Sequence, residues 1–405
     1  MIPINEQPYP LPEGWQWIRQ KNICELSQGE KLSDKMFPYL DVKYLRGMKE
    51  KSFVNSGNFI KAGTKIILVD GENSGEIFTA PEVGYMGSTF RVLNISESVN
   101  ADFFQYFAST KKDFYKKNKR GSAIPHLNKN LFYAMLFPLP PIDEQQRIVA
   151  LLDELFANLD EAKTLVQAVV DGSELRRAAI LHKAFTGELS KIWREEHGIT
   201  LDSWQQIQLG DVCQINPPKI STRNLSNDLK VSFVPMAAVS DVRGEITVPQ
   251  RKNLCEVKSG FTNFAEGDVL FAKITPCMEN GKAALVDKLV NHIGYGSTEF
   301  FVLRCGEKIF NRFVYHLVRW KIFRDEAKSV MAGAVGQQRV PKQFLTGYQL
   351  NLPPLEEQKE IVRLLDDLLG REQRTKDIAL QTIEHVETMK KSILARAFRG
   401  KLSTK

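Results

Sequence analysis

The chain has 405 residues, of which 43% are hydrophobic and 25% are charged, as in an ordinary soluble globular protein. Its 55 lysines and arginines outnumber its 48 aspartates and glutamates, and the net charge of +7 is a weak indication of a nucleic-acid partner. A single hydrophobic core does not grow to this length, so we expect two or more domains.

The same totals argue against several classes of protein. The five cysteines form no C-x-x-C pair and share no ligand spacing with the six histidines, which argues against a disulfide framework and a metal site. The first residues lack the basic and apolar regions of a leader peptide, and no apolar run approaches the roughly 20 residues that span a bilayer. We therefore expect a cytoplasmic protein without a bound metal.

Residues 1–141 are predicted to form a first lobe of mixed α/β structure. Strand-like runs occur at 65–69, after a glycine turn, and at 88–93. A helical pattern follows over 101–117. The order of the strands does not follow from the sequence.

A long helix is predicted over 142–190. The triplet Leu139-Pro140-Pro141 cannot be helical, and Asp143 then places a carboxylate at the helix N-terminus. Gly187 lies where the helix would end, which makes it about 40 residues or roughly 60 Å long. Apolar residues recur along it by four and three, which is typical of a heptad seam: Ile148, Leu152, Leu155, Leu159, Ala162, Val166 and Val169.

The rest of the chain repeats the first part. The motif over 139–145 returns 213 positions later as Leu-Pro-Pro-Leu-Glu-Glu-Gln over 352–358, and the motif over 184–190 returns at the same distance. Matches between the lobes start at a smaller offset, at Trp15 and Trp204, and the offset only climbs. We therefore predict a second lobe over 191–354, with strands at 268–272 and 299–303 and a helical pattern over 310–328, followed by a second helix over 355–405.

The seam of the second helix carries Ile361, Leu365 and Leu368 and then becomes poorer, with Glu372, Thr375 and Thr382 at seam positions. An apolar stripe on both helices is best buried against the other copy, and a two-fold relation between the copies would make the helices antiparallel. The alternative is that each helix packs separately on its own lobe. The predicted fold class is thus α+β, with two mixed α/β lobes joined by an antiparallel coiled coil in a pseudo-two-fold internal repeat. Double-stranded DNA is a common partner with a two-fold of its own.

Two variable lobes, each followed by an L-P-P-x-[DE]-E-Q helix that ends in A-F-x-G-x-L, resemble the specificity (S) subunit of type I restriction-modification enzymes. The resemblance covers essentially the whole chain. It implies that each lobe is a target recognition domain for one half of a split DNA site, and that the helices fix the gap between the halves.

The resemblance also implies partner subunits. Two methyltransferase (M) subunits would dock on the helices and modify adenine with S-adenosylmethionine, and two restriction (R) subunits would use ATP and Mg²⁺. The specificity subunit itself is implied to be non-catalytic and to bind no cofactor. The candidate docking residues are Ile148, Leu152, Leu155, Leu159, Ile361, Leu365 and Leu368.

Candidate DNA contacts are basic or amide side chains that recur at corresponding places in the two lobes, beside loops that contain glycine. A run of charges is also typical of a plain solvated face, so these are predictions of regions. In the first lobe the candidates are Lys43, Tyr44, Arg46, Lys116, Lys117, Lys119, Arg120, Ser122 and Asn128. In the second lobe they are Arg243, Lys273, Arg319, Arg324, Gln337, Gln338 and Arg339.

Two rival functions follow from other features. Asn216-Pro217-Pro218-Lys219 is similar to the N-P-P-[FY] motif of adenine methyltransferases, but Lys219 stands where the stacking aromatic should be, and no glycine-rich cofactor turn precedes it. A proline-stiffened loop is the plainer interpretation. The second rival is a coiled-coil scaffold that binds only protein, which would not bind any DNA duplex.

Overall fold

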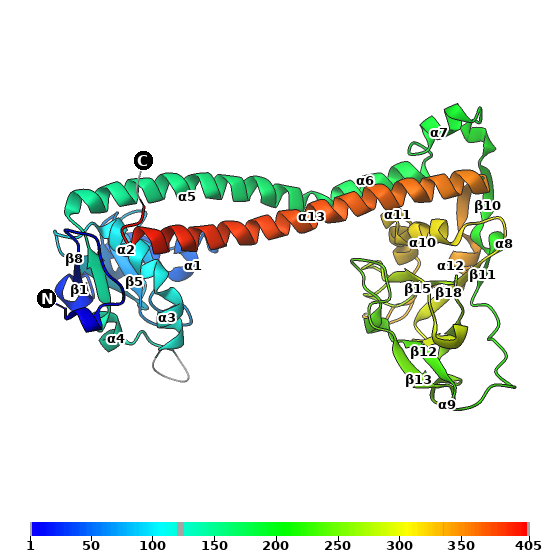
Figure 1. Ribbon diagram of the computed structural model, residues 1–405, viewed down its shortest axis with the longest axis horizontal. Helices are drawn as coiled ribbons and strands as arrows, with labels where there is room; N and C mark the ends of the chain where they lie inside the picture. The colour runs from blue at the N-terminus through cyan, green and yellow to red at the C-terminus, as the bar shows by residue number, and fades with distance from the viewer. Residues whose placement is uncertain (1, 120–124, 335, 403–405) are drawn as a thin grey trace. The chain divides into compact units, whose positions relative to one another are not determined.

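The computed structural model describes residues 2–119, 125–334 and 336–402 (Figure 1). The chain forms two compact units, one made by residues 1–167 with 380–405 and the other by residues 168–379. Each unit contains one lobe together with parts of both long helices. None of the described helices is both long enough and apolar enough to cross a membrane.

The first lobe consists of an antiparallel sheet, a small closed barrel and a two-stranded ribbon. The sheet has the order β2-β8-β5-β6, the barrel is β3-β4-β7, and the ribbon pairs β1 with β9. The strands are β1 Gln16–Arg19, β2 Cys24–Ser27, β3 Glu30–Leu40, β4 Phe53–Ile60, β5 Lys65–Leu68, β6 Ile77–Thr79, β7 Gly84–Met86, β8 Phe90–Ile95 and β9 Leu136–Leu139. The helices are α1 Val42–Leu45, α2 Ala101–Thr110, α3 Lys112–Lys117 and α4 Lys129–Ala134.

The second lobe repeats this plan, which confirms the predicted duplication. Its sheets have the orders β11-β18-β15-β16 and β13-β12-β17-β14, and β10 pairs with β19. The strands are β10 Gln205–Gln208, β11 Cys213–Ile215, β12 Lys230–Val234, β13 Gln250–Asn253, β14 Thr262–Phe264, β15 Val269–Ala272, β16 Ala283–Leu285, β17 Gly294–Gly296, β18 Phe300–Cys305 and β19 Gln349–Leu352. The helices are α8 Leu209–Val212, α9 Leu254–Val257, α10 Asn311–Arg319, α11 Lys321–Ser329 and α12 Lys342–Gly347.

The lobes differ where the second one is longer. In the first lobe β4 pairs with both β3 and β7 and closes the barrel. In the second lobe β13 and β14, with α9 between them, take its place beside β12 and β17. The predicted strands fall on β5, β8, β15 and β18, but both helical patterns are broken in two, at Lys111 and at Trp320.

The long helices begin directly after the two Leu-Pro-Pro triplets. The first runs as α5 Ile142–Asp171 and α6 Ser173–Phe185, and the second as α13 Leu355–Ala397. The expectation of one unbroken first helix is therefore corrected, because Gly172 interrupts it. Gly187 and Gly400 follow the two helix ends with φ of 81° and 65°, a left-handed conformation that favours glycine at a helix end. A short helix, α7 Lys191–Glu196, leads into the second lobe.

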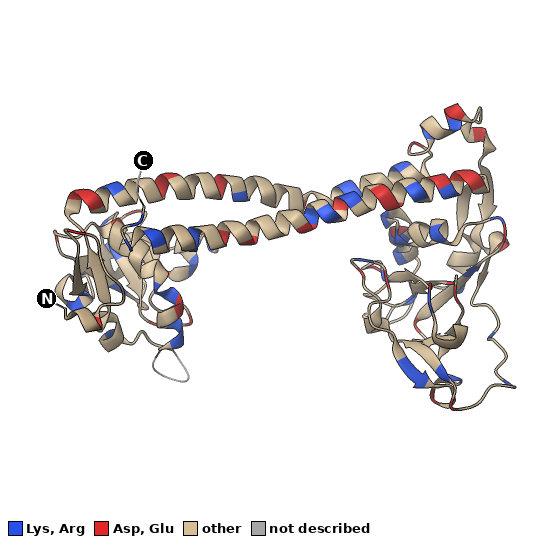
Figure 2. Ribbon diagram, in the orientation of Figure 1, with Lys and Arg blue, Asp and Glu red and all other residues tan. Residues whose placement is uncertain are grey.

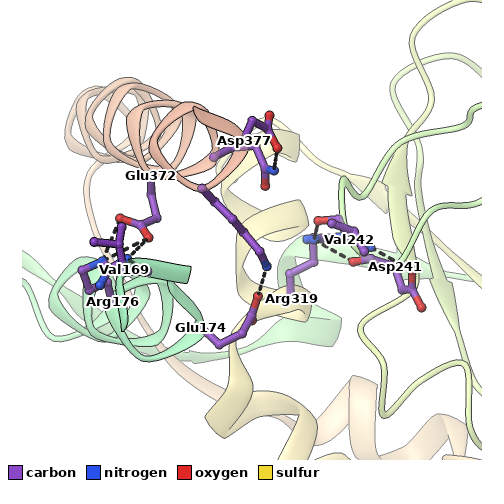
Figure 3. A network of polar contacts seen from close by, with 10 residues as sticks. Val169, Glu174, Arg176, Asp241, Val242, Arg319, Glu372 and Asp377 are labelled. Atoms are coloured by element: carbon purple, nitrogen blue, oxygen red, sulfur yellow. Dashed lines mark hydrogen bonds and ion pairs between the residues drawn. The ribbon is translucent and has the colours of Figure 1, made fainter. Parts of the chain in front are cut away.

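The helices pair in antiparallel fashion within each unit, as predicted. In the first unit α5 and α13 are joined by ion pairs from Lys163 to Glu387 and from Lys390 to Asp160. The second pair lies three residues earlier on α5 and three residues later on α13, so the two helices run in opposite directions. In the second unit α6 and α13 are joined from Arg176 to Glu372 and from Lys376 to Glu174 (Figure 3). The ion pair with Arg176, which holds the pKa of Glu372 below its usual range, explains why a carboxylate is tolerated at a seam position.

Each core takes in the start of one long helix and the end of the other. In the first unit Ile148 and Leu152 of α5 are buried together with Leu394 and Phe398. In the second unit the start of α13 is buried together with Leu181 of α6. The two lobes are thus closed by segments that are far apart in the sequence.

Gln145 and Gln358, the last residues of the motifs over 139–145 and 352–358, connect each long helix to its lobe by hydrogen bonds. The fully buried amides of Gln145 and Gln358 accept from the main-chain N–H groups of Asn100 and Phe310, at 2.7 and 2.8 Å. Each amide also donates to two main-chain carbonyls at 2.8–3.0 Å. Because Asn100 and Phe310 precede α2 and α10, the glutamines fix the angle between those helices and the long helices.

Candidate nucleic-acid interface

The basic helix α3 presents its lysines on the surface of the first lobe, where Figure 2 shows a cluster of positive charge. Lys116 and Lys117 are exposed and form no ion pair within the described part of the chain. Lys119 is different, because it pairs with Glu72 at 3.0 Å. The helix is anchored by the buried Tyr115, whose hydroxyl donates to Gln20 at 3.3 Å and whose pKa is raised by burial.

The loop after α3 connects to α4. The predicted contacts Arg120 and Ser122 lie outside the described residues. Asn128 caps α4, since its side-chain oxygen accepts from the main-chain N–H of Leu131 at 3.3 Å. The cap uses one lone pair of this oxygen, which leaves its second lone pair and the amide nitrogen for a ligand.

The patch on α1 is largely neutralised by carboxylates. Lys43 is exposed and has no ion pair in the described residues. Tyr44 donates its hydroxyl to Glu82, and this bond raises the pKa of Tyr44. Arg46 forms an ion pair with Glu76 and lies 5.9 Å from the ring centre of Phe78. Lys43 is therefore the member of this patch that is most available to a phosphate.

Arg319 and Arg324, also predicted to contact DNA, are partly exposed and bond main-chain carbonyls of the second lobe. Arg319 donates to the carbonyls of Asp241, Val242 and Gly281 at 3.0–3.2 Å (Figure 3). Arg324 donates to the carbonyls of Glu279 and of Arg319 itself. Burial lowers the pKa of both groups. These guanidinium groups hold loops in place because arginine can satisfy several carbonyls at once.

The other predicted residues of the second lobe lie on its surface. The side chain of Arg243 is 71% exposed and lies 3.4 Å from Glu245. Lys273 lies 5.6 Å from the ring centre of Phe301.

The loop after α11 is held at both ends. Arg339 bridges Ile274 and Ala332 through its main chain, and its side chain pairs with Glu299 at 2.9 Å, which lowers the pKa of Glu299. Gln338 accepts from the N–H of Thr275 through its main-chain carbonyl, and Gln337 is exposed.

Four exposed basic residues on the described strands were not among the predicted contacts. Lys31 and Lys35 lie on β3, Lys230 lies on β12 and Arg251 on β13, and none of the four forms an ion pair within the described residues. β3 contains a bulge between Ser33 and Phe37 that interrupts its alternation, and β12 is buried at every position after Lys230. Their strand positions were therefore not visible in the sequence pattern.

The predicted partner-docking residues differ in burial, and their role in docking stays a prediction. Ile148, Leu152, Ile361 and Leu365 are buried in the cores of their own units, so these side chains are not free to contact another subunit. Leu155, Leu159 and Leu368 are partly buried. Exposed apolar residues occur instead at Leu165 of α5 and Leu175 of α6, which are 66% and 77% exposed.

The Asn216 motif has a structural role. The side-chain oxygen of Asn216 accepts from the N–H of Val302 at 3.0 Å, and its own N–H donates to the carbonyl of Val302 at 2.7 Å. The amide is thus used to extend the pairing of β11 with β18. Within the described residues no three His, Cys, Asp or Glu side chains are grouped so that they could hold a metal ion.

Comparison with known proteins identifies relatives of both lobes. The type I restriction modification DNA specificity domain matches residues 12–169 and again residues 202–385. The chain is 38% identical to the EcoAI type I restriction enzyme specificity subunit of Escherichia coli, over 45% of this chain and 31% of the relative. It is 25% identical to the MjaVIII specificity subunit of Methanocaldococcus jannaschii, over 98% of this chain and 94% of the relative. The chain thus spans about a third of the first relative and nearly all of the second.

Solved structures share the fold. A chain from a study of complex assembly and conformational transition of the type I R-M system matches with a TM-score of 0.74 and 21% identity, covering 98% of this chain and 100% of that one. The HsdS subunit from Thermoanaerobacter tengcongensis matches with a TM-score of 0.63 and 22% identity over the same shares.

Proposed function

Because the chain belongs to the family defined by the type I restriction modification DNA specificity domain, we propose that it selects the DNA target of a type I restriction-modification complex. The observation that carries the proposal is the duplication. Two lobes built on one plan match the same specificity domain and differ in sequence. Each lobe would recognise one half of a bipartite site, through exposed residues such as Lys116 in the first lobe and Gln337 in the second.

The proposal assigns the chemistry to other subunits. Two methyltransferase subunits would bind the paired helices, and two restriction subunits would join through them. S-adenosylmethionine, ATP and Mg²⁺ would be used by those subunits. Leu165 of α5 and Leu175 of α6 are exposed and so are available to such partners.

An exchange of lobes tests the proposal. Residues 1–138 are replaced by the first lobe of another specificity subunit, the protein is expressed with its methyltransferase partners, and methylated adenines are mapped across the genome. We expect only one half of the recognised sequence to change, since each lobe has its own core. A change in both halves would contradict independent recognition, and a map unaffected by deletion of this protein would contradict the proposed function.

A further inference from the structure

The second unit contains a cleft of about 1010 Å³ between its helices and its lobe. One wall is formed by α6 and α13, and the other by α10 with residues 241–245. Figure 3 shows the region, with Glu174 and Glu372 on the helix side and Arg319 on the lobe side. The structure describes all the residues that line this cleft.

The helix wall repeats an arrangement of the first unit with one charge missing. In the first unit two ion pairs cross between the helices, Lys163 with Glu387 and Lys390 with Asp160. Lys163 and Glu387 each have a counterpart 213 positions away in the sequence, Lys376 and Glu174. These two counterparts also form an ion pair, at 3.4 Å, in the second unit. The helix geometry is therefore repeated closely enough to compare the second pair.

The counterpart of Lys390 is Arg177, and the counterpart of Asp160 is Gln373. A neutral amide thus replaces the carboxylate, and this amide donates to Asp377 at 3.0 Å. Both Arg177 and Gln373 line the cleft. Lys390 has a carboxylate partner on the facing helix, whereas Arg177 forms no ion pair within the described residues.

The lobe wall carries a positive charge at one position where the first unit has a negative charge. Asp102, the second residue of α2, pairs with Lys65 at 2.6 Å in the first unit. The second residue of α10 is Arg312, which lines the cleft and lies 3.0 Å from Asp366. A carboxylate is replaced here by a guanidinium group.

Tyr315 lies among these arginines. Its ring centre is 5.6 Å from Arg319, and its hydroxyl donates to the carbonyl of Arg243 at 3.3 Å. Burial raises the pKa of Tyr315, and the charges of Arg319, Arg177 and Arg312 act against that increase. Acidic residues also line the cleft. Asp366 and Glu174 have basic partners, Asp377 accepts a hydrogen bond from Gln373, and Asp241, Glu245 and Asp287 lie on the lobe side.

We infer that this cleft binds a phosphate group, which Arg177 and Arg312 hold from opposite walls. Both guanidinium groups line the cleft, and Arg312 already pairs with Asp366, so Arg177 supplies the charge that an anion would neutralise. Arginine matches the geometry of phosphate oxygens, and Arg312 has further donors to share with the same group. The inference rests on the proposed function for its expected source, the backbone of bound DNA. A free nucleotide offers the same chemistry and is tested separately.

Two variants of the full chain remove the site in opposite ways. Arg177→Gln deletes the cation, and Gln373→Asp restores the carboxylate that the first unit has at Asp160, which should occupy Arg177 without disturbing the fold. Lys390→Gln is the matched control, because Lys390 is the counterpart of Arg177 and already has a partner. Thermal unfolding of all three proteins checks that they are folded.

Binding is measured by fluorescence anisotropy with a labelled DNA duplex at several salt concentrations, and by calorimetry with inorganic phosphate and with ATP. We expect both cleft variants to bind duplex about tenfold more weakly and to lower the slope of log K against log salt by about 0.9, while the control does not. Loss of phosphate or ATP binding with unchanged duplex binding would support the site and assign it to free phosphate.

Wild-type affinity for every one of these ligands in both cleft variants would overturn the inference. A wild-type chain that binds no duplex would instead contradict the proposed function, and the phosphate and ATP measurements would still decide the cleft.

Discussion

In the first unit the hydroxyl of Tyr106 in α2 donates to Asp153 of α5 at 2.5 Å. In the second unit His316 of α10 lies 3.1 Å from Asp366 of α13, the carboxylate 213 positions after Asp153. The joint between lobe and long helix is thus kept, while the partner of the carboxylate has changed from a phenol to an imidazole. Burial lowers the pKa of His316, whereas burial and Asp153 raise the pKa of Tyr106.

The start of each long helix shows a second difference of this kind. Glu144 pairs with Arg147 one turn along its own helix, on the surface. Its counterpart Glu357 is fully buried and accepts from Arg194 of α7 at 2.6 Å, from Ser190 at 2.7 Å and from Trp204 at 2.9 Å. One motif position therefore serves as a surface residue in one unit and as the centre of a buried network in the other. Duplicated sequence predicts a shared backbone, but it does not predict a shared role for each side chain.

The largest expected effect is at this buried network. Glu357→Gln should lower the free energy of unfolding by about 3–5 kcal/mol, because it leaves the buried Arg194 without a counter-charge. Glu144→Gln should cost less than about 1 kcal/mol, since its pair is exposed to solvent. Urea denaturation followed by circular dichroism measures both. Equal costs for the two variants would show that the network does not depend on burial.

The second prediction compares the basic helices of the two lobes. Lys116→Glu with Lys117→Glu in α3 should weaken binding to most DNA duplexes alike by more than about tenfold and reduce its salt dependence. Lys321→Glu with Lys328→Glu in α11 should have a smaller effect, because Asp325 and Glu279 already neutralise these lysines. Filter binding at several salt concentrations measures both double variants, and a weaker effect in α3 than in α11 would contradict the assignment of α3.

The third prediction concerns pH. Burial lowers the pKa of His316, although Asp366 acts in the other direction and Arg312 and Arg319 act with burial. Below about pH 6.5 the unfolded chain therefore takes up a proton before the folded chain does, and the free energy of unfolding falls by at most about 1.4 kcal/mol per pH unit. Above this pH the histidine is neutral in both states and contributes no pH dependence.

His316→Gln should remove this acid-side loss of stability, which is measured by thermal unfolding between pH 5 and pH 8. Tyr106→Phe in the first unit is the matched control and should leave the pH dependence unchanged. If the pH dependence of the His316→Gln variant equals that of the wild type, the imidazole is not its source.

The smallest effects are expected where the helices cross. Lys163→Ala and Lys376→Ala each remove one copy of the same exposed ion pair, so each should cost less than about 1 kcal/mol of unfolding free energy, and less in high salt. Thermal unfolding at low and high salt measures the difference. A cost for Lys376→Ala well above that for Lys163→Ala would indicate that the cleft beside Lys376 adds to the interaction.

Much of the fold could be predicted from the sequence, because the constant offset revealed one element present twice. The helix starts followed from the Leu-Pro-Pro triplets, and the antiparallel pairing followed from a seam that both copies must bury. The break at Gly172 was missed, since a single glycine inside a periodic pattern is usually tolerated. The exchange of helix ends between the cores was also missed, because periodicity does not show which lobe a helix contacts.

The structural roles of the candidate residues were less visible in the sequence than the fold. Arg319 and Arg324 stood in a basic stretch like surface residues, yet their guanidinium groups bond main-chain carbonyls, which carry no sequence signature. The same limit hides the glutamines at 145 and 358, whose amides also bond main-chain groups. Arg177 became visible only when the ion pairs of one unit could be compared with those of the other.

Each core contains the end of the long helix that follows the other lobe in the sequence, and this affects the order of folding during synthesis. Residues 1–167 lack Leu394, Ala397 and Phe398 of their own core until residues 168–379 have left the ribosome. At about 5–20 residues per second that interval lasts roughly 10–40 s. We therefore expect the first lobe to stay incompletely folded, with the face that Phe398 will cover exposed to solvent, until the end of synthesis. All segments of the second core have been synthesised before that point, so the second lobe can complete its folding earlier.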